Sequence, residues 1–277
     1  MRMKMRVALG ALIVLVAAAW WLSRPLSISP GSMPDHDPDL ANGERIFYAG
    51  GCASCHGKPG GEDDEALLLT GGLELESPYG VFVAPNISPH KQNGIGGWSE
   101  WEFTNAMRRG VSPDGRHYFP AFPYTSYARM TIPGVLDLKA YIDTLPPADT
   151  GNQEHNIDFP YGFRRPLGIW KRLFMSTDFV IPVESGSGLL ERGRYLVEGP
   201  GHCGECHTPR NRLGALRMDQ WLTGAPSLEG EGKVPGIDAE ALSGWSEGDI
   251  SYYLESGFDP DFDVVGGDMV KVTEHLA

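Results

Sequence analysis

Cysteine, basic charge and long apolar runs are all scarce in this chain. It has four cysteines in 277 residues, too few for the disulfide framework of a small secreted domain. Its 23 Lys and Arg residues face 36 Asp and Glu residues, and the resulting net charge of −13 excludes the basic surface that nucleic-acid binding requires. Only one long apolar run is present, from Val7 to Leu22, which excludes a protein with several membrane-spanning helices.

All four cysteines belong to two copies of one motif, C-x-x-C-H, at residues 52–56 and 203–207. On a helical turn, residues three apart face the same side, so the two thiols of one motif can reach the two vinyl groups of one porphyrin. The histidine that follows is placed to ligate the iron. The sequence therefore predicts two covalently bound haem c groups, held by Cys52, Cys55 and His56 and by Cys203, Cys206 and His207.

Two other uses of paired cysteines fit this spacing less well. A structural zinc site brings four ligands onto one ion, typically from pairs about 15–20 residues apart. Here 147 residues lie between Cys55 and Cys203. A redox-active dithiol of the thioredoxin type gives no reason for a histidine to follow both pairs. Haem attachment is the interpretation that explains every residue of both motifs.

The N-terminal segment has the layout of an export signal. Arg2, Lys4 and Arg6 precede the apolar run 7–22, which is slightly shorter than the about 17–25 residues of a spanning helix. Alanines at 17–19 offer a cleavage site, whereas the two tryptophans that follow favour a retained helix. Residues 1–25 are thus predicted to be a signal peptide or, by preference, a signal anchor in the cytoplasmic membrane. The body is predicted to face the periplasm, and to be soluble there if the segment is cleaved.

Export makes the remaining chain more acidic. Without the first 24 residues, 19 basic residues face 36 acidic ones, which gives a net charge of −17. Such a field argues against nucleic acid and against an anionic membrane face as partners, and it favours a protein partner with a basic docking patch. The same charge is consistent with a well-solvated surface alone, and composition does not separate the two.

An internal repeat divides the exported chain into two similar halves. Residues 43–52 resemble residues 193–203, and residues 97–110 resemble residues 244–257 at the same internal spacing. Because each half contains one C-x-x-C-H motif, the repeat predicts two similar haem domains, each largely self-contained.

The two halves are predicted to hold the same helices. An amphipathic helix, over 42–48 or 189–197, leads into the haem motif, and a second helix begins at Ser99 or Ser246 and ends at a glycine. An all-α fold follows. The predicted division of the exported chain is a tether at 26–41, a first haem domain at 42–147, a packed connector at 148–192 and a second haem domain at 193–277.

The sixth ligand of each iron decides whether a haem carries electrons or does chemistry. A methionine closes the iron and raises its potential, whereas an open position allows small molecules to bind. In the second half the candidate is Met269, in a glycine-rich loop, and in the first half the leading candidate is Met130. Met107 and His117 stay open as alternatives for the first haem.

Several further segments resemble one family. They lie at 79–88, 94–98, 118–127 and 138–146 in the first half and at 206–211, Cys-His-Thr-Pro-Arg-Asn, in the second. Together with the haem motifs they resemble the multihaem cytochrome c subunits of bacterial alcohol and gluconate dehydrogenases and their dihaem relatives. The resemblance implies two tandem cytochrome c domains. It also implies that electrons pass from a partner dehydrogenase in the periplasm to a quinone, an oxidase or another cytochrome.

The chain departs from this family in three ways. Many relatives have methionine where Phe122 stands, which is consistent with a ligand moved to Met130. The further haem domain of the three-haem relatives is missing. The helix that should close the second domain would begin near the last residue, Ala277, so the chain is expected to be a fragment.

An electron carrier without catalytic residues is therefore the predicted function. The main alternative is a dihaem enzyme of the peroxidase or thiosulfate dehydrogenase type, which needs an open or unusual sixth position at one haem. A haem-based sensor is a further alternative.

Overall fold

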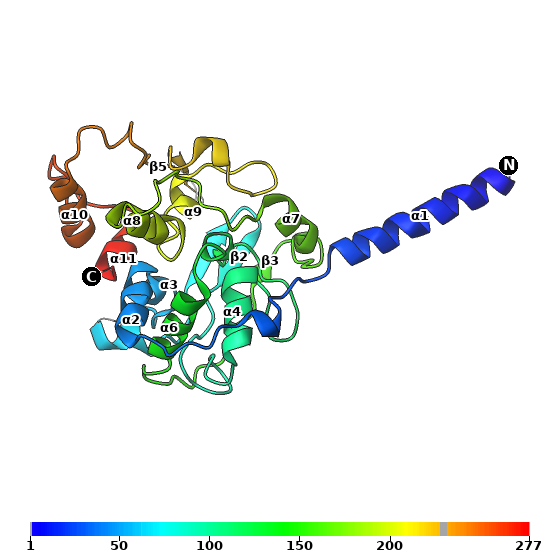
Figure 1. The fold of residues 1–277 in the computed structure, drawn as a ribbon, viewed down its shortest axis with the longest axis horizontal. Coiled ribbons are helices and arrows are strands. Elements are labelled where there is room, and N and C mark those ends of the chain that lie inside the picture. The colour runs from blue at the N-terminus through cyan, green and yellow to red at the C-terminus, as the bar shows by residue number, and fades with distance from the viewer. Residues whose placement is uncertain (1, 62, 228–231, 277) are drawn as a thin grey trace.

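The computed structural model of the chain describes every residue except 1, 62, 228–231 and 277, and it shows a rounded head from which one helix projects (Figure 1). This helix is α1 (Arg2–Leu22), whose stretch Met3–Leu22 has a mean hydropathy of 2.0 and lies fully exposed. By length and composition α1 is able to cross a membrane, a property that signal sequences and anchors share.

The head is built around two crossed helices of the first repeat, α2 (Leu40–Ala49) and α6 (Ile132–Ile142), which make the most extensive contact between any two described elements. They meet at Gly43, where an added Cβ would lie 2.1 Å from the backbone oxygen of Asp137. Only glycine lets α2 approach the backbone of α6 so closely. The core beside this crossing includes the buried side chains of Ile46, Phe47, Phe103, Met107, Met130, Val135 and Leu138.

The helix α4 (Glu100–Arg109) and its counterpart α10 (Glu247–Ser256) confirm the predicted caps. Before each helix, the hydroxyl of Ser99 or Ser246 accepts a backbone N–H from the third helical residue, and the acidic side chain of that residue accepts the serine N–H in return. Each helix ends at a left-handed glycine, Gly110 with φ 57° and Gly257 with φ 75°. The repeat in the sequence is therefore a repeat of structure.

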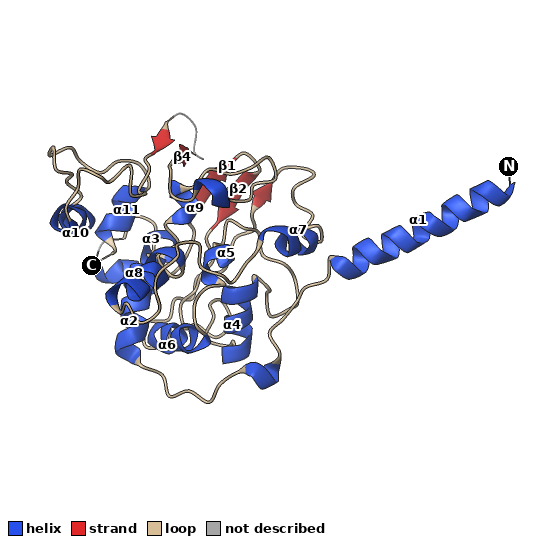
Figure 2. Ribbon diagram, turned by 45° about the horizontal axis from the view of Figure 1, so that its top comes forward, coloured by secondary structure: helices blue, strands red, loops and turns tan. Residues whose placement is uncertain are grey.

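Two small sheets correct the prediction of an all-α fold. β1 (Glu74–Ser77) and β2 (Gly80–Val83) form an antiparallel hairpin, and β3 (Asn156–Ile157) pairs with β2 on its other side. The second sheet pairs β4 (Ala225–Pro226) with β5 (Lys233–Val234) (Figure 2). These strands are too short to show an alternating pattern, and β3 depends on a partner far away in the sequence.

Residues 26–41, predicted to be a tether, run along the surface of the head and are bonded to it. The backbone N–H of Ile28 donates to Asn105 Oδ1 at 2.7 Å, and Ile28 itself is buried. Further along, His36 Nε2 lies 2.6 Å from Asp137 Oδ1 on α6. The segment therefore links α1 to α2 as part of the fold.

The second repeat lies against the first. Its helix α8 (Leu189–Glu198) confirms the predicted helix before the second motif, and its last helix is α11 (Met269–Glu274). α11 reaches the first haem motif, where Ser54 Oγ donates to the Lys271 carbonyl at 2.8 Å (Figure 1). Within the described part of the chain, the buried members of the main core all belong to the first repeat. The two repeats are therefore joined by direct contacts, and the main core lies in the first.

The remaining elements are short. They are α3 (Cys52–His56), α5 (Tyr124–Tyr127), α7 (Leu167–Phe174), α9 (Gly204–His207) and the 3-10 turns η1 (Pro30–Ser32), η2 (Asp63–Leu68) and η3 (Met218–Gln220). α7 belongs to the connector and contacts the end of α1. α3 contains the first C-x-x-C-H motif, and α9 with its N-cap Cys203 contains the second.

Candidate haem-binding sites

Each C-x-x-C-H motif forms a short helix directly after a longer helix of its repeat. Gly51, with φ 54°, turns the chain from α2 into α3, and His202, with φ 41°, lies between α8 and α9. Each motif is one helical turn, as predicted, so its two cysteines face one side. All four thiols are free of disulfide bonds. Both pairs are therefore available to one porphyrin each.

The two motif histidines are held by the same kind of bond. His56 Nδ1 lies 2.8 Å from the carbonyl oxygen of Pro85, and His207 Nδ1 lies 2.8 Å from that of Pro235. Because a carbonyl only accepts, each Nδ1 carries the proton and Nε2 keeps its lone pair. Burial lowers the pKa of both histidines, against a smaller opposing effect of these hydrogen bonds. Both rings are therefore neutral at pH 7 and have Nε2 ready for a metal.

The thiols are also in the neutral form. Burial raises the pKa of Cys52 to about 12 and that of Cys203 and Cys206 to about 11. A redox-active dithiol would instead need a lowered pKa. Among the residues that the structure describes, no three or more His, Cys, Asp or Glu side chains gather where they could hold a metal ion. The raised thiol pKa values thus argue against a redox-active dithiol.

The surroundings of the second motif fit a large flat group with its own acceptors. An added Cβ at Gly204 would lie 2.1 Å from the ring of Trp221, so the motif backbone packs directly on this indole. Trp221 Nε1 is buried and has no hydrogen-bond acceptor in the described structure. A haem brings carboxylates that can accept such a bond. The residues present therefore fit a haem, which when bound supplies an iron that cycles between two oxidation states.

The three candidate methionines occupy different positions. Met130 is buried in the core against which Cys52 packs, and Met107 is buried in the same core from α4. Met269 is half-buried and is the first residue of α11. Met269 therefore lies where the predicted glycine-rich loop meets α11.

Matching turns after α4 and α10 fix the register of the two repeats. In each, the carbonyl of the helix-ending glycine, Gly110 or Gly257, accepts the N–H of the residue eight positions later, at 2.8 Å and 2.7 Å. Gly257 follows Gly110 by 147 residues, and the same interval relates Met269 to Phe122. The position that Met269 occupies in the second repeat is thus taken in the first by Phe122, and Met130 lies eight residues further on.

His117 is engaged elsewhere. It is buried, and its Nε2 lies 2.9 Å from the carbonyl oxygen of Ser23, next to the end of α1. Burial lowers its pKa, and the hydrogen bond to Ser23 opposes this effect. Because this nitrogen is bonded to a backbone carbonyl, the structure places His117 at the junction of α1 with the head.

Sequence reasoning missed the two prolines that orient the histidines. The sequence does contain a signal for them, because Pro-x-Ile occurs at 85–87 and again at 235–237. The first proline follows its motif histidine by 29 residues and the second by 28. The isoleucine of each copy donates its N–H to the carbonyl of a leucine, Leu69 at 3.1 Å or Leu222 at 2.8 Å. These turns carry each proline carbonyl to its histidine.

A buried glutamate inside the second motif connects it to the first repeat. Glu205 accepts hydrogen bonds from the hydroxyls of Thr125 and Ser126 on α5, the latter at 3.1 Å. Arg210 Nη2 donates to its other oxygen at 2.8 Å. A residue between Cys203 and Cys206 is therefore fixed by side chains of the other repeat.

A second buried glutamate, Glu198, ends α8. Its carboxylate accepts the backbone N–H groups of Val180 at 2.5 Å and Ile181 at 2.7 Å, and it lies 3.6 Å from Arg129 Nε. The Arg129 and Glu198 side chains are only 2% and 0% exposed. Sequence reasoning counted these residues among the surface charges, whereas they connect the first repeat, the connector and the second repeat.

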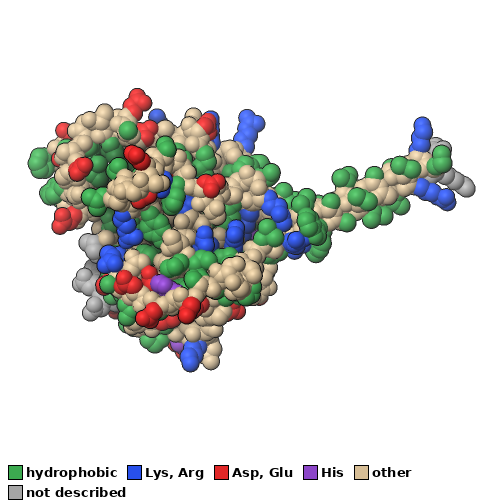
Figure 3. Space-filling model, in the orientation of Figure 1, with side chains coloured by type: hydrophobic (Ala, Val, Ile, Leu, Met, Phe, Trp, Pro, Cys, Tyr) green, Lys and Arg blue, Asp and Glu red, His purple; other side chains and the backbone are tan. Residues whose placement is uncertain are grey.

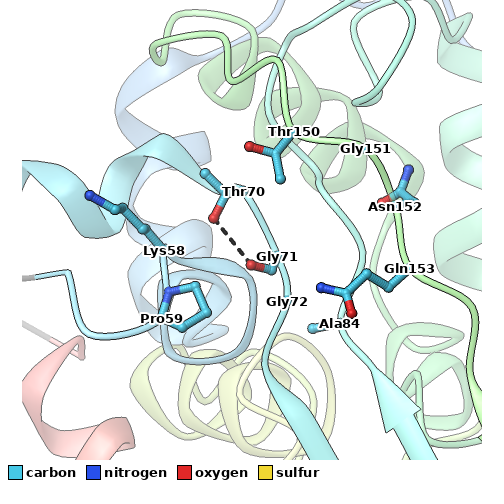
Figure 4. A pocket seen from close by; sticks show the side chains of 10 residues that line it. All are labelled: Lys58, Pro59, Thr70, Gly71, Gly72, Ala84, Thr150, Gly151, Asn152 and Gln153. Atoms are coloured by element: carbon cyan, nitrogen blue, oxygen red, sulfur yellow. Dashed lines mark hydrogen bonds between the residues drawn. The ribbon is translucent and has the colours of Figure 1, made fainter.

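A hollow of about 300 Å³ lies beside the loop that follows the first motif (Figure 4). Its walls come from residues 58–59, 70–72, Ala84 and 150–153. In its wall, Thr70 Oγ1 donates to the carbonyl of the next residue, Gly71, at 3.1 Å. Lys58 is its one titratable lining group, so the hollow adds no catalytic group to the haem sites.

The fold and the two anchored histidine turns define a c-type haem protein, and comparison with known sequences agrees. Residues 40–146 match the cytochrome c family. Over 277 residues the chain is 46% identical to a protein of Cereibacter sphaeroides described as diheme cytochrome c-type, covering 100% of this chain and 93% of that protein. The chain belongs to the cytochrome c family, and covalently bound haem c is its cofactor.

Two dehydrogenase subunits are also similar, as the predicted resemblance implied. The fructose dehydrogenase cytochrome subunit of Gluconobacter japonicus is 36% identical over 251 residues, which are 88% of this chain and 50% of that protein. The gluconate 2-dehydrogenase cytochrome c subunit of Pantoea cypripedii is 35% identical over 251 residues, which are 87% of this chain and 56% of that protein. The chain spans about half the length of these two relatives.

Proposed function

We propose that this protein is a dihaem electron carrier of the periplasm, held at the cytoplasmic membrane by α1. It accepts electrons from a partner dehydrogenase and passes them to a quinone, an oxidase or another cytochrome. The observation that carries the proposal is the pair of C-x-x-C-H turns, each with its histidine bonded to a proline carbonyl at 2.8 Å. The names of the related dehydrogenase subunits support the choice of donor.

The proposed iron ligands are His56 with Met130 and His207 with Met269. Met130 is the more deeply buried of the two core methionines, and it lies in a core that includes Cys52 at its edge. Met269 follows the turn that mirrors the first repeat. If methionine fills the sixth position of both irons, neither iron has an open position for a substrate. Electron transfer is then the activity that remains.

A dihaem enzyme is the second candidate, and Phe122 is the observation that favours it. This phenylalanine stands in the register position of Met269 and packs on Tyr127 at a ring distance of 5.5 Å. If Met130 does not reach the first iron, that iron has an open side. A peroxidase or thiosulfate dehydrogenase type of reaction would then take place at the first haem.

The number of attached haems is the first test. The full chain, matured in a strain that attaches haem c, should carry two haem masses after denaturation and acid extraction, because each motif is a separate turn. Cys52→Ser/Cys55→Ser and Cys203→Ser/Cys206→Ser should each retain one. Mass spectrometry measures this directly. One haem in the unmodified chain, or bound zinc, rejects the dihaem proposal.

Carbon monoxide separates the carrier from the enzyme. The reduced protein should bind none, since both irons are closed, whereas Met269→Ala and Met130→Ala should each bind one equivalent and lose one high-potential step in a redox titration. Met107→Ala is the matched control, because Met107 is buried in the same core. Binding of one equivalent by the unmodified protein would instead support the enzyme, with the open haem identified by which variant adds a second.

A further inference from the structure

A cluster of basic and exposed apolar side chains surrounds the point where α1 joins the head. We propose that this surface binds anionic phospholipid headgroups and holds the head against the membrane. We call it the interfacial patch and define it by Arg24, Phe159, Phe163, Arg165, Arg172 and Leu173. The proposal goes beyond electron transfer, but it rests on the proposed anchoring role of α1.

The end of α1 is built into the head, which fixes the orientation of the two. Ser23 is buried, and its carbonyl oxygen lies 2.9 Å from His117 Nε2. Arg165 Nε donates to Ser23 Oγ at 2.9 Å. An added Cβ at Gly168 would lie 2.1 Å from the Ser23 carbonyl oxygen, so α7 is in direct backbone contact with this turn. If α1 spans a membrane, the same face of the head must meet the headgroups.

Three arginines gather around the last turn of α1. Arg165 donates to the Trp20 carbonyl at 2.7 Å and lies 4.1 Å from the centre of the Trp20 ring. Arg172 Nε donates to the Leu22 carbonyl at 2.6 Å. The guanidinium of Arg24 lies 4.0 Å from the Trp21 ring centre. Tryptophan and arginine at the end of an apolar helix are the residues expected at headgroup depth.

These arginines have donors left for phosphate. A guanidinium carries five N–H groups, and Arg172, which is exposed, uses one of them in the bonds described. Arginine is also the side chain best suited to bind phosphate oxygens in pairs. The chemistry of the patch therefore matches a phosphodiester more closely than a hydrocarbon surface alone.

The apolar part of the patch lies in the connector before and after these arginines. Phe159, Phe163 and Leu173 are 87%, 63% and 68% exposed, and the two phenylalanine rings lie 6.0 Å apart. Transfer of such exposed apolar side chains from water to a lipid interface lowers their free energy. A loop that joins aromatic and basic residues in this way is typical of a surface that lies on a membrane.

The local charge is opposite to that of the whole protein. Residues 158–175 contain four basic residues and only Asp158 as an acid, although the exported chain has a net charge of −17. Figure 3 shows Lys and Arg side chains gathered where the helix meets the head. The sequence argument against an anionic membrane face rests on the summed charge, whereas the local charge of this patch is positive. Its continuity with α1 favours a lipid surface over an acidic protein.

Hydrogen exchange of the full-length haem protein in lipid nanodiscs tests the proposal. Amides of 158–175 should exchange about tenfold more slowly in phosphatidylglycerol-containing discs than in pure phosphatidylcholine discs, because binding suppresses local opening. Phe163→Ser/Leu173→Ser should remove this protection. The matched control is Phe262→Ser/Leu189→Ser, since these residues are 78% and 88% exposed elsewhere on the head. Arg172→Gln should weaken the lipid dependence, whereas Arg116→Gln, at an exposed arginine that pairs with Asp114, should not.

Two further controls identify the source of the anion and show which of the proposals fails if no protection is seen. Inorganic phosphate added to phosphatidylcholine discs should give no protection; equal protection would show a free-anion site and overturn the membrane proposal. Protein that elutes with the discs but shows no difference between lipids overturns the patch alone. Protein that does not elute with the discs overturns both the patch and the anchor, while two attached haems in the same sample would leave the electron-carrier proposal intact.

Discussion

Gly43→Ala is expected to lower the free energy of unfolding by about 3 kcal/mol or more, because the new methyl group overpacks the crossing of α2 and α6. Its Cβ would lie 2.1 Å from the Asp137 carbonyl oxygen and 2.9 Å from Tyr141 Cβ. A backbone atom cannot relieve the clash by changing rotamer as a side chain can, so the two helices must move apart. For a chain of this size, the loss corresponds to a fall in Tm of about 6–12 °C.

The second repeat contains the control. Gly193 on α8 corresponds to Gly43 on α2 in the sequence repeat, but an added Cβ there meets nothing within 4 Å. Gly193→Ala should therefore stabilise the protein by up to about 1 kcal/mol through helix propensity alone. Thermal unfolding of the haem-loaded variants, followed by circular dichroism, measures both. Equal Tm values for the two variants would show that the crossing tolerates a methyl group.

This pair of glycines also shows what a repeat can and cannot predict. The alignment of 43–52 with 193–203 predicts a helix before each motif, and both helices form, because their apolar spacing is local. It gives Gly43 and Gly193 the same environment, whereas only Gly43 lies against a second helix. What differs is tertiary contact, which no local pattern records.

The same limit explains the other differences between sequence and structure. The haem motifs and the serine caps depend on residues three or four apart, so their spacing in the sequence is sufficient to predict them. The strand β3 depends on β2, the segment at His36 depends on Asp137, and the interfacial patch depends on Arg165 reaching Ser23. Each of these joins residues far apart in the chain. The candidate ligand Met130 falls in the same class, because its distance from an iron depends on how the loop folds back.

Arg129→Met is expected to cost about 3–5 kcal/mol, because it leaves the Glu198 carboxylate buried without its cation. Glu198 keeps the N–H groups of Val180 and Ile181, but the positive charge 3.6 Å away is lost. Arg129 also gives up its bond to the Asp178 carbonyl, at 2.8 Å. The contacts removed join the first repeat to the connector and to α8, so the loss should show as easier separation of the second repeat.

Two further variants show whether the loss of stability in Arg129→Met comes from the buried charge. Arg116→Met removes an exposed partner of Asp114 and should change stability by less than about 1 kcal/mol. Adding Glu198→Gln to Arg129→Met removes the uncompensated charge, so the double variant should recover part of the loss, with a coupling of about 1–3 kcal/mol. Denaturant unfolding at pH 7, combined with amide exchange of residues 189–198, measures both quantities. If Arg129→Met unfolds like Arg116→Met, the buried ion pair does not hold the two repeats together, and the other contacts between them, of Glu205 with α5 and of Ser54 with Lys271, do so instead.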